Sequence, residues 1–282
     1  MSAGLSEQAL RAAAEAAAGN ALAEDLAGLG DLAGRAFAVP GTARVEARAP
    51  GVLSGVAAFC AAARLVDPEL RVAFAVRAGE RFAAGDTLGT LGGRLSSILA
   101  LERTGLNFLA RLSGVATLTA RYVAETAGTG ATIAGTRKTT PGLRALEKQA
   151  IADGGGSPHR FGLFDGAMIK DNHVAAAGGV GAAVAAVRAG LTHAHLLEVE
   201  VDSAAQLDEA LAAGVPVILL DNMDVAAVRD AVSRVAGRAV LEVSGGVTLE
   251  SVRAYAETGV QVISVGALTT AAPWIDLSLV VS

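Results

Sequence analysis

The chain of 282 residues has one cysteine, Cys60, only 3 lysines and only 4% aromatic residues. A single cysteine excludes an intrachain disulfide and a metal cluster held by several cysteines, and it predicts a reducing compartment, the cytoplasm. The hydrophobic content of 52% comes mostly from alanine, which still allows a sizeable core and argues against disorder. The net charge of −5 argues against a nucleic-acid-binding surface.

Long apolar runs are also missing. The longest bland stretch, Val174 to Val187, has 14 residues of Ala, Gly and Val. A helix that crosses a bilayer needs about 20 apolar residues, so we expect a buried or surface helix here and no membrane span. Near the N-terminus, Glu7, Arg11 and Glu15 lie among alanines. This pattern predicts an amphipathic helix and lacks the basic-then-apolar order of a signal peptide.

The few lysines are clustered. Lys138, Lys148 and Lys170 lie within 33 residues. Arg137 directly precedes that stretch, which also contains Arg144, His159 and Arg160. A preference for arginine codons would explain why lysine is rare, but it would not explain the clustering. A compact ammonium differs chemically from a planar guanidinium. The cluster therefore predicts an anion-binding site.

The first ~110 residues predict a mixed α/β domain. We expect strands at Val45–Ala49 and Leu70–Val76, a helix at Val56–Leu65, and a hairpin region that ends at Gly92-Gly93. Such a hairpin is also typical of lipoyl and biotinyl carriers, but these need a lysine at the tip and residues 79–93 have none. A long helix is expected over Ser96–Glu125. Its buried stripe is formed by Leu106, Leu109, Leu112 and Val115.

From residue 130 onward, strands and helices alternate, which predicts a parallel sheet. The expected strands are Ala131–Ala134, Ala167–Lys170, Leu196–Val201, Pro216–Leu220, Ala239–Val243 and Gln261–Val265. The expected helices include Ser203–Ala213, Val225–Val235 and Leu249–Thr258. Regular spacing without a dinucleotide-binding fingerprint favours a barrel, and six strands make it incomplete. The predicted domains are 1–112 and 113–270, with the tail 271–282 returning to the first domain as a strand.

Polar residues recur where these strands end. In barrels of parallel strands, catalytic groups lie at the carboxyl ends. The polar ends are Thr136-Arg137-Lys138, Lys170-Asp171-Asn172-His173, Glu198 with Glu200, Asp221-Asn222, Ser244-Gly245-Gly246 and Gly266-Ala267. Single occurrences could be caps or turns, but a repetition at the same end of six strands predicts an active site.

Three kinds of chemistry are expected at these ends. The two glycine-rich ends offer backbone N–H groups that suit phosphate. The cations Arg137, Lys138, His159, Arg160 and Lys170 suit carboxylates. Glu200 and Asp221 could hold Mg²⁺ together with substrate oxygens, stabilise a positively charged sugar, or form an ion pair with Lys170 in the empty enzyme.

Taken together, these strings resemble the quinolinate phosphoribosyltransferase family over roughly residues 100 to 270. The matching strings are Glu102-Arg103-Thr104, Leu106-Asn107-Phe108, Leu112-Ser113-Gly114-Val115-Ala116-Thr117, Gly135-Thr136-Arg137-Lys138-Thr139-Thr140-Pro141-Gly142-Leu143-Arg144, Gly154-Gly155-Gly156, His159-Arg160, Lys170-Asp171-Asn172-His173, Glu198-Val199-Glu200-Val201, Leu220-Asp221-Asn222, Ser244-Gly245-Gly246 and Val265-Gly266-Ala267-Leu268. They appear in the family's order. One departure is Ser157-Pro158, where a Val-Asn pair is common before the His-Arg.

The resemblance implies an open α/β sandwich followed by an incomplete α/β barrel. It implies that Arg137, His159, Arg160 and Lys170 receive the quinolinate carboxylates, with Lys138 near the ribose and pyrophosphate. It implies a homodimer, or a higher oligomer, in which Arg103 reaches the partner's active site. Glu200 and Asp221 would bind the ribose hydroxyls and Mg²⁺. The 5-phosphate cradle would consist of Ser244, Gly245, Gly246, Gly266 and Ala267, and Thr136 and Val265 complete the predicted substrate-binding residues.

The implied reaction joins quinolinate to the ribose of phosphoribosyl pyrophosphate and releases pyrophosphate and carbon dioxide, with Lys170, Glu200 and Asp221 as catalytic residues. Related phosphoribosyltransferases that use nicotinate, or that are linked to molybdenum-transport operons, remain alternatives. A monocarboxylate would not need Arg103, Arg137, Arg160 and Lys170 together. A Schiff-base aldolase with Lys170 as nucleophile is a rival of another class, and a binding protein without activity is the last.

Overall fold

The structure is a computed structural model that describes residues 6–282. Contacts between residues divide the chain into two compact units. Unit 1 contains the chain up to Ala120 together with Thr139–Gly156 and Leu268–Ser282. Unit 2 contains Arg121–Lys138 and Ser157–Ala267. The boundary predicted between residues 112 and 113 lies inside one continuous helix, α3 (Leu95–Glu125).

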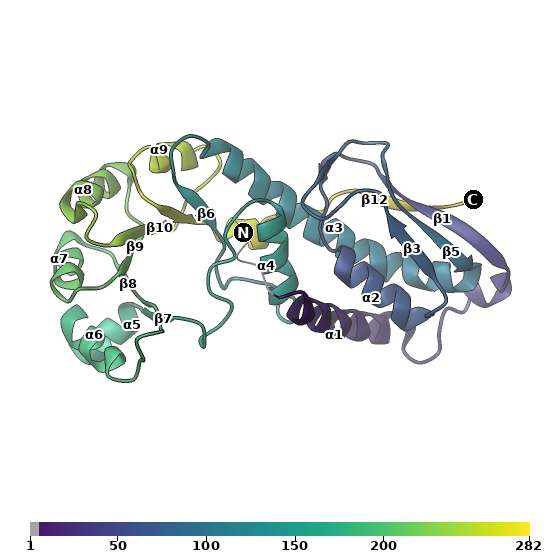
Figure 1. The fold of residues 1–282 in the computed structure, drawn as a ribbon, viewed down its shortest axis with the longest axis horizontal. Coiled ribbons are helices and arrows are strands. Elements are labelled where there is room, and N and C mark those ends of the chain that lie inside the picture. The colour runs from purple at the N-terminus through teal and green to yellow at the C-terminus, as the bar shows by residue number, and fades with distance from the viewer. Residues whose placement is uncertain (1–5) are drawn as a thin grey trace. The chain divides into compact units, whose positions relative to one another are not determined.

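Unit 1 is built on an antiparallel sheet with the strand order β12-β1-β5-β3. Its strands are β1 (Pro40–Ala47), β3 (Arg71–Phe74), β5 (Thr87–Arg94) and β12 (Leu277–Val281). The C-terminal segment, expected to return as a strand, forms β12 and pairs with β1, with Ala43 opposite Val281 (Figure 1). A separate pair of short strands consists of β2 (Gly51–Val52) and β4 (Arg81–Phe82).

Four helices and two short helical turns accompany this sheet in unit 1. They are α1 (Glu7–Leu26), α2 (Val56–Val66), α3 and α4 (Arg144–Asp153), with the short turns η1 (Gly34–Phe37) and α10 (Ala267–Thr270). Phe59 of α2 is fully buried and stacks edge-on against Phe74 of β3, with ring centroids 5.4 Å apart. A Cβ on Gly105 would lie 2.7 Å from the Phe59 ring, so glycine lets α3 pack closely against α2.

The predicted stripe of α3 is confirmed, because its four members are at most 2% exposed: Leu106, Leu109, Leu112 and Val115.

Unit 2 is a curved sheet of six parallel strands in the order β6-β11-β10-β9-β8-β7. The strands are β6 (Thr132–Ala134), β7 (Ala167–Ile169), β8 (Leu197–Val201), β9 (Val217–Asp221), β10 (Val240–Ser244) and β11 (Val262–Ser264). The helices are α5 (Asp171–Ala177), α6 (Val180–Arg188), α7 (Ala204–Ala212), α8 (Val225–Val235) and α9 (Val252–Ala256). Figure 1 shows α6, α7 and α8 on the outer side of the strands. The sheet ends at β6 and β7, so the predicted α/β fold with an incomplete parallel barrel is confirmed.

Some predicted bounds were wrong. The stretch Val174 to Val187 is divided between two helices, α5 and α6, because Gly178 and Gly179 adopt positive φ angles of 82° and 148°. The first strand starts at Pro40 and not at Val45, because Pro40 to Thr42 pair with β5.

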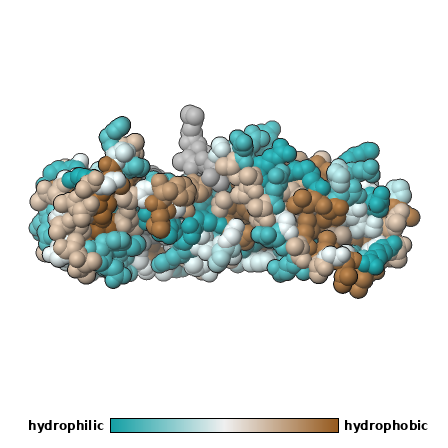
Figure 2. All heavy atoms as spheres, turned by 90° about the horizontal axis from the view of Figure 1, so that it is seen from below, coloured by the Kyte–Doolittle hydropathy of each residue, from teal (hydrophilic) through white to brown (hydrophobic). Residues whose placement is uncertain are grey.

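Within residues 6–282, no helix combines the length and the apolar composition that would be needed to cross a membrane. The face seen in Figure 2 mixes hydrophobic and hydrophilic residues in small patches.

Candidate active site

The strand register of unit 2 aligns polar residues in rows across its sheet. Asp221 at the end of β9 pairs with Ser244 at the end of β10, which in turn pairs with Ser264 of β11. A second row lies two residues earlier along the strands. In it, Glu200 of β8 pairs with Leu219 of β9, and Leu219 pairs with Glu242 of β10. Because side chains two residues apart on a strand share a face, both rows lie on the same side of the sheet. The predicted polar strand ends therefore share one edge.

The loop after β6 meets the loop after β11. The backbone N–H of Lys138 donates to Thr136 Oγ1 at 3.1 Å, which makes a tight turn directly after the strand. A Cβ on Gly266 would lie 3.3 Å from Cδ of Lys138. The Lys138 side chain thus lies against one of the two glycine-rich ends, and a phosphate bound there would be within the field of its ammonium group.

Lys170 forms an ion pair with Glu200, so the predicted pairing of these two groups is present. The Glu200 side chain is 15% exposed and that of Lys170 45%. The backbone N–H of Lys170 donates to His173 Nδ1 at 3.0 Å, which fixes the turn between β7 and α5. Lys148, the third lysine of the chain, lies in α4 of unit 1 and is fully buried, whereas Lys170 is partly exposed.

Asp221 and the first glycine-rich loop are connected through Asn222. The Asn222 side-chain amide donates to Asp221 Oδ2 at 2.7 Å, and its backbone N–H donates to the Ser244 carbonyl at 2.9 Å. Gly245 has φ +95°, and a Cβ there would lie 2.1 Å from Asn222 Oδ1. Only glycine fits this position, both because of the backbone conformation and because of the close approach.

The loop that follows Pro158 carries two of the predicted cations. Arg160 donates to the Gly166 carbonyl at 2.9 Å, and a second nitrogen lies 3.2 Å from the Met168 sulfur. Burial lowers the pKa of Arg160, while the negative charge of Glu198 raises it. Ser157, at the departure from the family pattern, pairs with β6: its N–H donates to Ile133 at 2.8 Å and its carbonyl accepts from Gly135 at 2.9 Å. The change therefore preserves a backbone link to the sheet.

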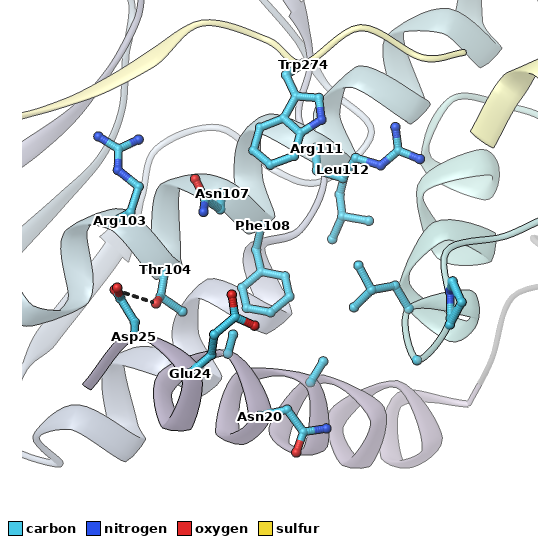
Figure 3. Close-up of a pocket in the computed structure, with 15 residues that line it drawn as sticks. Asn20, Glu24, Asp25, Arg103, Thr104, Asn107, Phe108, Arg111, Leu112 and Trp274 are labelled. Atoms are coloured by element: carbon cyan, nitrogen blue, oxygen red, sulfur yellow. Dashed lines mark hydrogen bonds between the residues drawn. The ribbon is translucent and has the colours of Figure 1, made fainter. Parts of the chain in front are cut away.

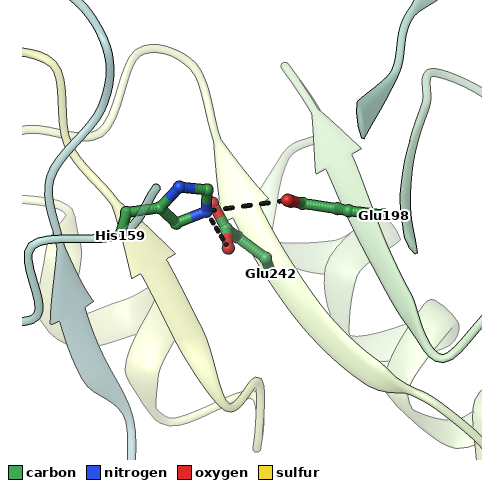
Figure 4. Close-up of side chains that lie close together, drawn as sticks. All are labelled: His159, Glu198 and Glu242. Atoms are coloured by element: carbon green, nitrogen blue, oxygen red, sulfur yellow. Dashed lines mark hydrogen bonds and ion pairs between the residues drawn. The ribbon is translucent and has the colours of Figure 1, made fainter. Parts of the chain in front are cut away.

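His159 faces two buried carboxylates (Figure 4). Its Nε2 lies 3.1 Å from Glu242 Oε2 and 3.7 Å from Glu198 Oε2. Burial, followed by repulsion from Glu242, raises the pKa of Glu198 to about 7, against the opposing charges of His159, Arg160 and Lys170.

Arg103 belongs to unit 1, apart from the other predicted site residues, which belong to unit 2. It projects from α3 at a cavity of about 360 Å³ whose lining includes Asn107, Arg111 and Trp274 (Figure 3). Arg103 is exposed, and no residue among 6–282 pairs with its guanidinium. Its neighbour Arg111 is bound differently, by Glu147 at 2.7 Å and by carbonyls of the C-terminal segment.

Comparison with known sequences decides the family. The model of the quinolinate phosphoribosyl transferase C-terminal domain matches residues 115–280, and that of the N-terminal domain matches residues 31–113. The chain belongs to the quinolinate phosphoribosyl transferase family. The resemblance expected from the motifs is thereby confirmed.

The matches to known quinolinate phosphoribosyl transferase family members cover most of this chain. The nicotinate-nucleotide pyrophosphorylase [carboxylating] of Mycobacterium leprae is 45% identical over 247 residues, 84% of this chain and 85% of the relative. The probable nicotinate-nucleotide pyrophosphorylase [carboxylating] of Synechocystis sp. is 40% identical over 263 residues, 92% of this chain and 89% of the relative. The solved nicotinate-nucleotide pyrophosphorylase of Francisella tularensis is 36% identical with a TM-score of 0.93, and the match covers 96% of this chain and 97% of that one.

Two buried residues add detail to the predicted site. Val265 is only 2% exposed, so its side chain belongs to the core and only its backbone could contact a substrate. Glu242 was not predicted as a site residue, although it is 3% exposed and contacts His159. Its place two residues before Ser244, in an otherwise apolar strand, was the signal that would have found it.

Proposed function

We propose that this chain transfers the phosphoribosyl group of phosphoribosyl pyrophosphate to quinolinate with decarboxylation, giving nicotinate mononucleotide, pyrophosphate and carbon dioxide in NAD biosynthesis. The observation that carries the proposal is the single polar edge of unit 2, where cations, carboxylates and glycine-rich loops follow neighbouring parallel strands. Family membership and relatives named as carboxylating pyrophosphorylases support the same reaction.

The cations are assigned to the quinolinate carboxylates. Quinolinate has two adjacent carboxylates, and the proposed receivers are Arg137, His159, Arg160 and Lys170. Arginine can bind a carboxylate through two parallel hydrogen bonds, which also fixes the plane of the ring. The contacts of Arg160 to Gly166 and Met168 support this role, because they hold its guanidinium in place before a substrate binds.

The glycine-rich ends are assigned to the 5-phosphate of the ribose. The proposed cradle is formed by Ser244, Gly245, Gly246, Gly266 and Ala267, with Thr136 and the backbone of Val265 beside it. Backbone N–H groups at such turns bind phosphate oxygens. Lys138 lies against Gly266 and is assigned to the ribose and pyrophosphate end of the donor.

Glu200 and Asp221 are proposed to hold Mg²⁺ and the ribose hydroxyls. They fit that ion, since they are carboxylates at the ends of neighbouring strands, β8 and β9, and each is only partly buried. Mg²⁺ prefers one or two carboxylates together with phosphate oxygens, and when bound it would neutralise charge on the departing pyrophosphate. Asn222 orients the Asp221 carboxylate, and Lys170 neutralises Glu200 before the substrates arrive.

The same carboxylates bear on the chemical step. Departure of pyrophosphate leaves positive charge on the ribose ring, and preorganised carboxylates stabilise such charge. The pyridine nitrogen then forms the bond to the ribose carbon. The resulting pyridinium withdraws electrons from the carbon that carries the 2-carboxylate, so carbon dioxide leaves, its bonding electrons stay on that carbon, and a proton takes the place of the carboxylate. Lys170 is assigned to this end of the reaction, where its ammonium would stabilise the developing negative charge.

A homodimer in the cytoplasm completes the proposal, with Arg103 of one protomer acting in the active site of its partner. The exposure of Arg103, at a cavity of unit 1 and without an ion pair among residues 6–282, supports this role. An exposed guanidinium is available to a carboxylate that a second copy of the chain presents.

Substrate comparison tests the reaction. Purified protein with Mg²⁺ and phosphoribosyl pyrophosphate receives quinolinate or nicotinate, and nicotinate mononucleotide and carbon dioxide are measured. We expect both products from quinolinate and none from nicotinate. Product from nicotinate alone would mean that the cations do not recognise a dicarboxylate. Trapping of the protein by borohydride would instead indicate a Schiff base at Lys170.

Mixing two inactive variants tests the dimer. Arg103→Ala and Lys170→Ala each disable one contribution to a shared site. If Arg103 acts in the partner's site, random mixing of exchanged protomers restores about a quarter of the wild-type sites, because half the dimers are mixed and one of their two sites is intact. No recovery after exchange would mean that Arg103 acts within its own protomer or not at all.

A further inference from the structure

We infer that Glu242 is a positioning residue, which together with Glu198 holds the imidazole of His159 in the orientation and charge that bind a carboxylate of the substrate. The inference rests on the proposed function, since His159 is there assigned to quinolinate. It concerns groups from three elements of unit 2: β8, β10 and the loop after Pro158.

The contact geometry is that of an anchored ring. His159 Nε2 lies 3.1 Å from Glu242 Oε2, within hydrogen-bond distance, and 3.7 Å from Glu198 Oε2. The side chains of both glutamates are 4% exposed and that of His159 15%. Figure 4 shows Nε2 turned toward the carboxylates and Nδ1 on the other side of the ring. When one ring nitrogen is bound in this way, the hydrogen bond decides how the other presents itself.

The backbone shows that this position is held under strain. His159 has φ +58°, in the left-handed region that residues with a Cβ rarely adopt. Such conformations persist where the surroundings fix them, and they gather at sites that need one particular placement. The carboxylates of Glu242 and Glu198 are side-chain contacts that fix this residue from the barrel interior.

The charges explain why two buried acids are present in this place. One oxygen of each carboxyl group, Oε1 of Glu198 and Oε1 of Glu242, is buried and has no hydrogen-bond partner among the described residues. Buried carboxylates are costly unless cations face them, and the cations near this pair are His159, Arg160 and Lys170. An imidazolium with Nε2–H toward Glu242 meets that need. It also places a second proton on Nδ1.

A metal site is the competing explanation for the same trio. Ligand atoms of His159, Glu198 and Glu242 all lie within 4.8 Å of one another, a spacing that a transition metal could bridge. However, the positive charges of Arg160 and Lys170 already act on Glu198, and Arg137 acts on Arg160. A divalent cation placed among them would be repelled. The positioning role is therefore favoured, and metal binding becomes an outcome of the test.

Steady-state kinetics of Glu242→Gln is the first measurement. Glutamine keeps the size and one acceptor oxygen of the glutamate but removes its charge. We expect the KM for quinolinate to rise roughly ten- to hundredfold, the range of one hydrogen bond to a charged group, while the KM for phosphoribosyl pyrophosphate stays unchanged. Glu242→Asp should recover part of the loss. Ile263→Val, which trims the fully buried core of the neighbouring strand, is the control for a general loss of packing.

Two further readouts separate positioning from mere structure. In a His159→Ala background, Glu242→Gln should add no further loss, because the residue acts through the imidazole. In ¹⁵N-histidine spectra, the His159 signals, assigned by their loss in His159→Asn, should show both ring nitrogens protonated in the wild type. One of them should lose its proton in Glu242→Gln. The chain has only 4 histidines, so the assignment is practicable.

Three results would overturn the inference. These are an equal rise in both KM values, full additivity of the two substitutions, or one equivalent of Zn²⁺ bound by the wild type and lost in Glu242→Gln. If the wild type makes no nicotinate mononucleotide at all, the proposed function fails. The ring-nitrogen spectra then decide on their own whether Glu242 holds His159.

Discussion

The carboxyl group of Glu198 makes folding stability depend on pH in a predictable way. In the folded chain its pKa is raised from 4.5 to about 7, first by burial and then by repulsion from Glu242. Between these values the native state binds more protons than the unfolded state. Stability therefore falls as the pH rises from 4.5 to 7, and the full cost is present above 7. A shift of about two and a half pH units, at roughly 1.4 kcal/mol per unit, corresponds to about 3 kcal/mol.

Replacing Glu198 by glutamine should remove this cost. The amide has nearly the same size and cannot ionise. We expect Glu198→Gln to be more stable than the wild type at pH 8 by up to about 3 kcal/mol, and nearly equal to it at pH 4.5.

Urea unfolding followed by circular dichroism at several pH values measures the difference in unfolding free energy between the two proteins. Glu257→Gln, which removes an exposed carboxyl of the same unit, is the control. A stability difference that does not change with pH, or a variant less stable than the wild type at pH 8, would refute the reasoning.

Three further predictions test other parts of the structure. Lys170→Ala should lower kcat at least ~100-fold, as expected for a lost catalytic charge, and near wild-type turnover would remove it from the mechanism. Gly245→Ala should raise the KM for phosphoribosyl pyrophosphate and lower the unfolding free energy by about 1–3 kcal/mol in urea titrations, because its backbone and its neighbours leave no room for a Cβ. Gly246→Ala, with nothing within 4 Å of the added carbon, should lose less stability. Arg111→Met should lower the unfolding free energy in urea titrations by about 3–5 kcal/mol, since it removes the cation that pairs with the fully buried Glu147 and leaves that carboxylate with the hydrogen bonds from Thr140. Adding Glu147→Gln should restore most of the loss.

Periodicity made the fold of unit 2 predictable. Each of its six strands was expected within two residues of its observed bounds, because buried parallel strands are short apolar runs between amphipathic helices. The join between α5 and α6 was missed, since alanine-rich sequence forms one helix or two with little difference in composition. There the decision belongs to a pair of glycines in unusual backbone conformations, which composition does not reveal.

The site was predictable where its residues lie next to each other in the sequence. Lys170 directly follows β7 and Asp221 ends β9, so their location followed from the strand pattern. The contact of His159 with Glu242 could not be predicted in this way, because 83 residues separate them and only the folded chain brings them together. A lone glutamate inside a strand carries no indication of its partner until the topology is known.

The pairing of β12 with β1 has a consequence for synthesis of the chain. β1 finds one neighbour, β5, soon after both have left the ribosome, but its other neighbour follows only after the whole of unit 2. In that interval β1 presents an open edge of unpaired N–H and C=O groups, the kind of edge on which nascent chains associate. Unit 2 can meanwhile complete its sheet from an almost continuous segment. The nascent protein should therefore depend on chaperones for its first unit and not for its second.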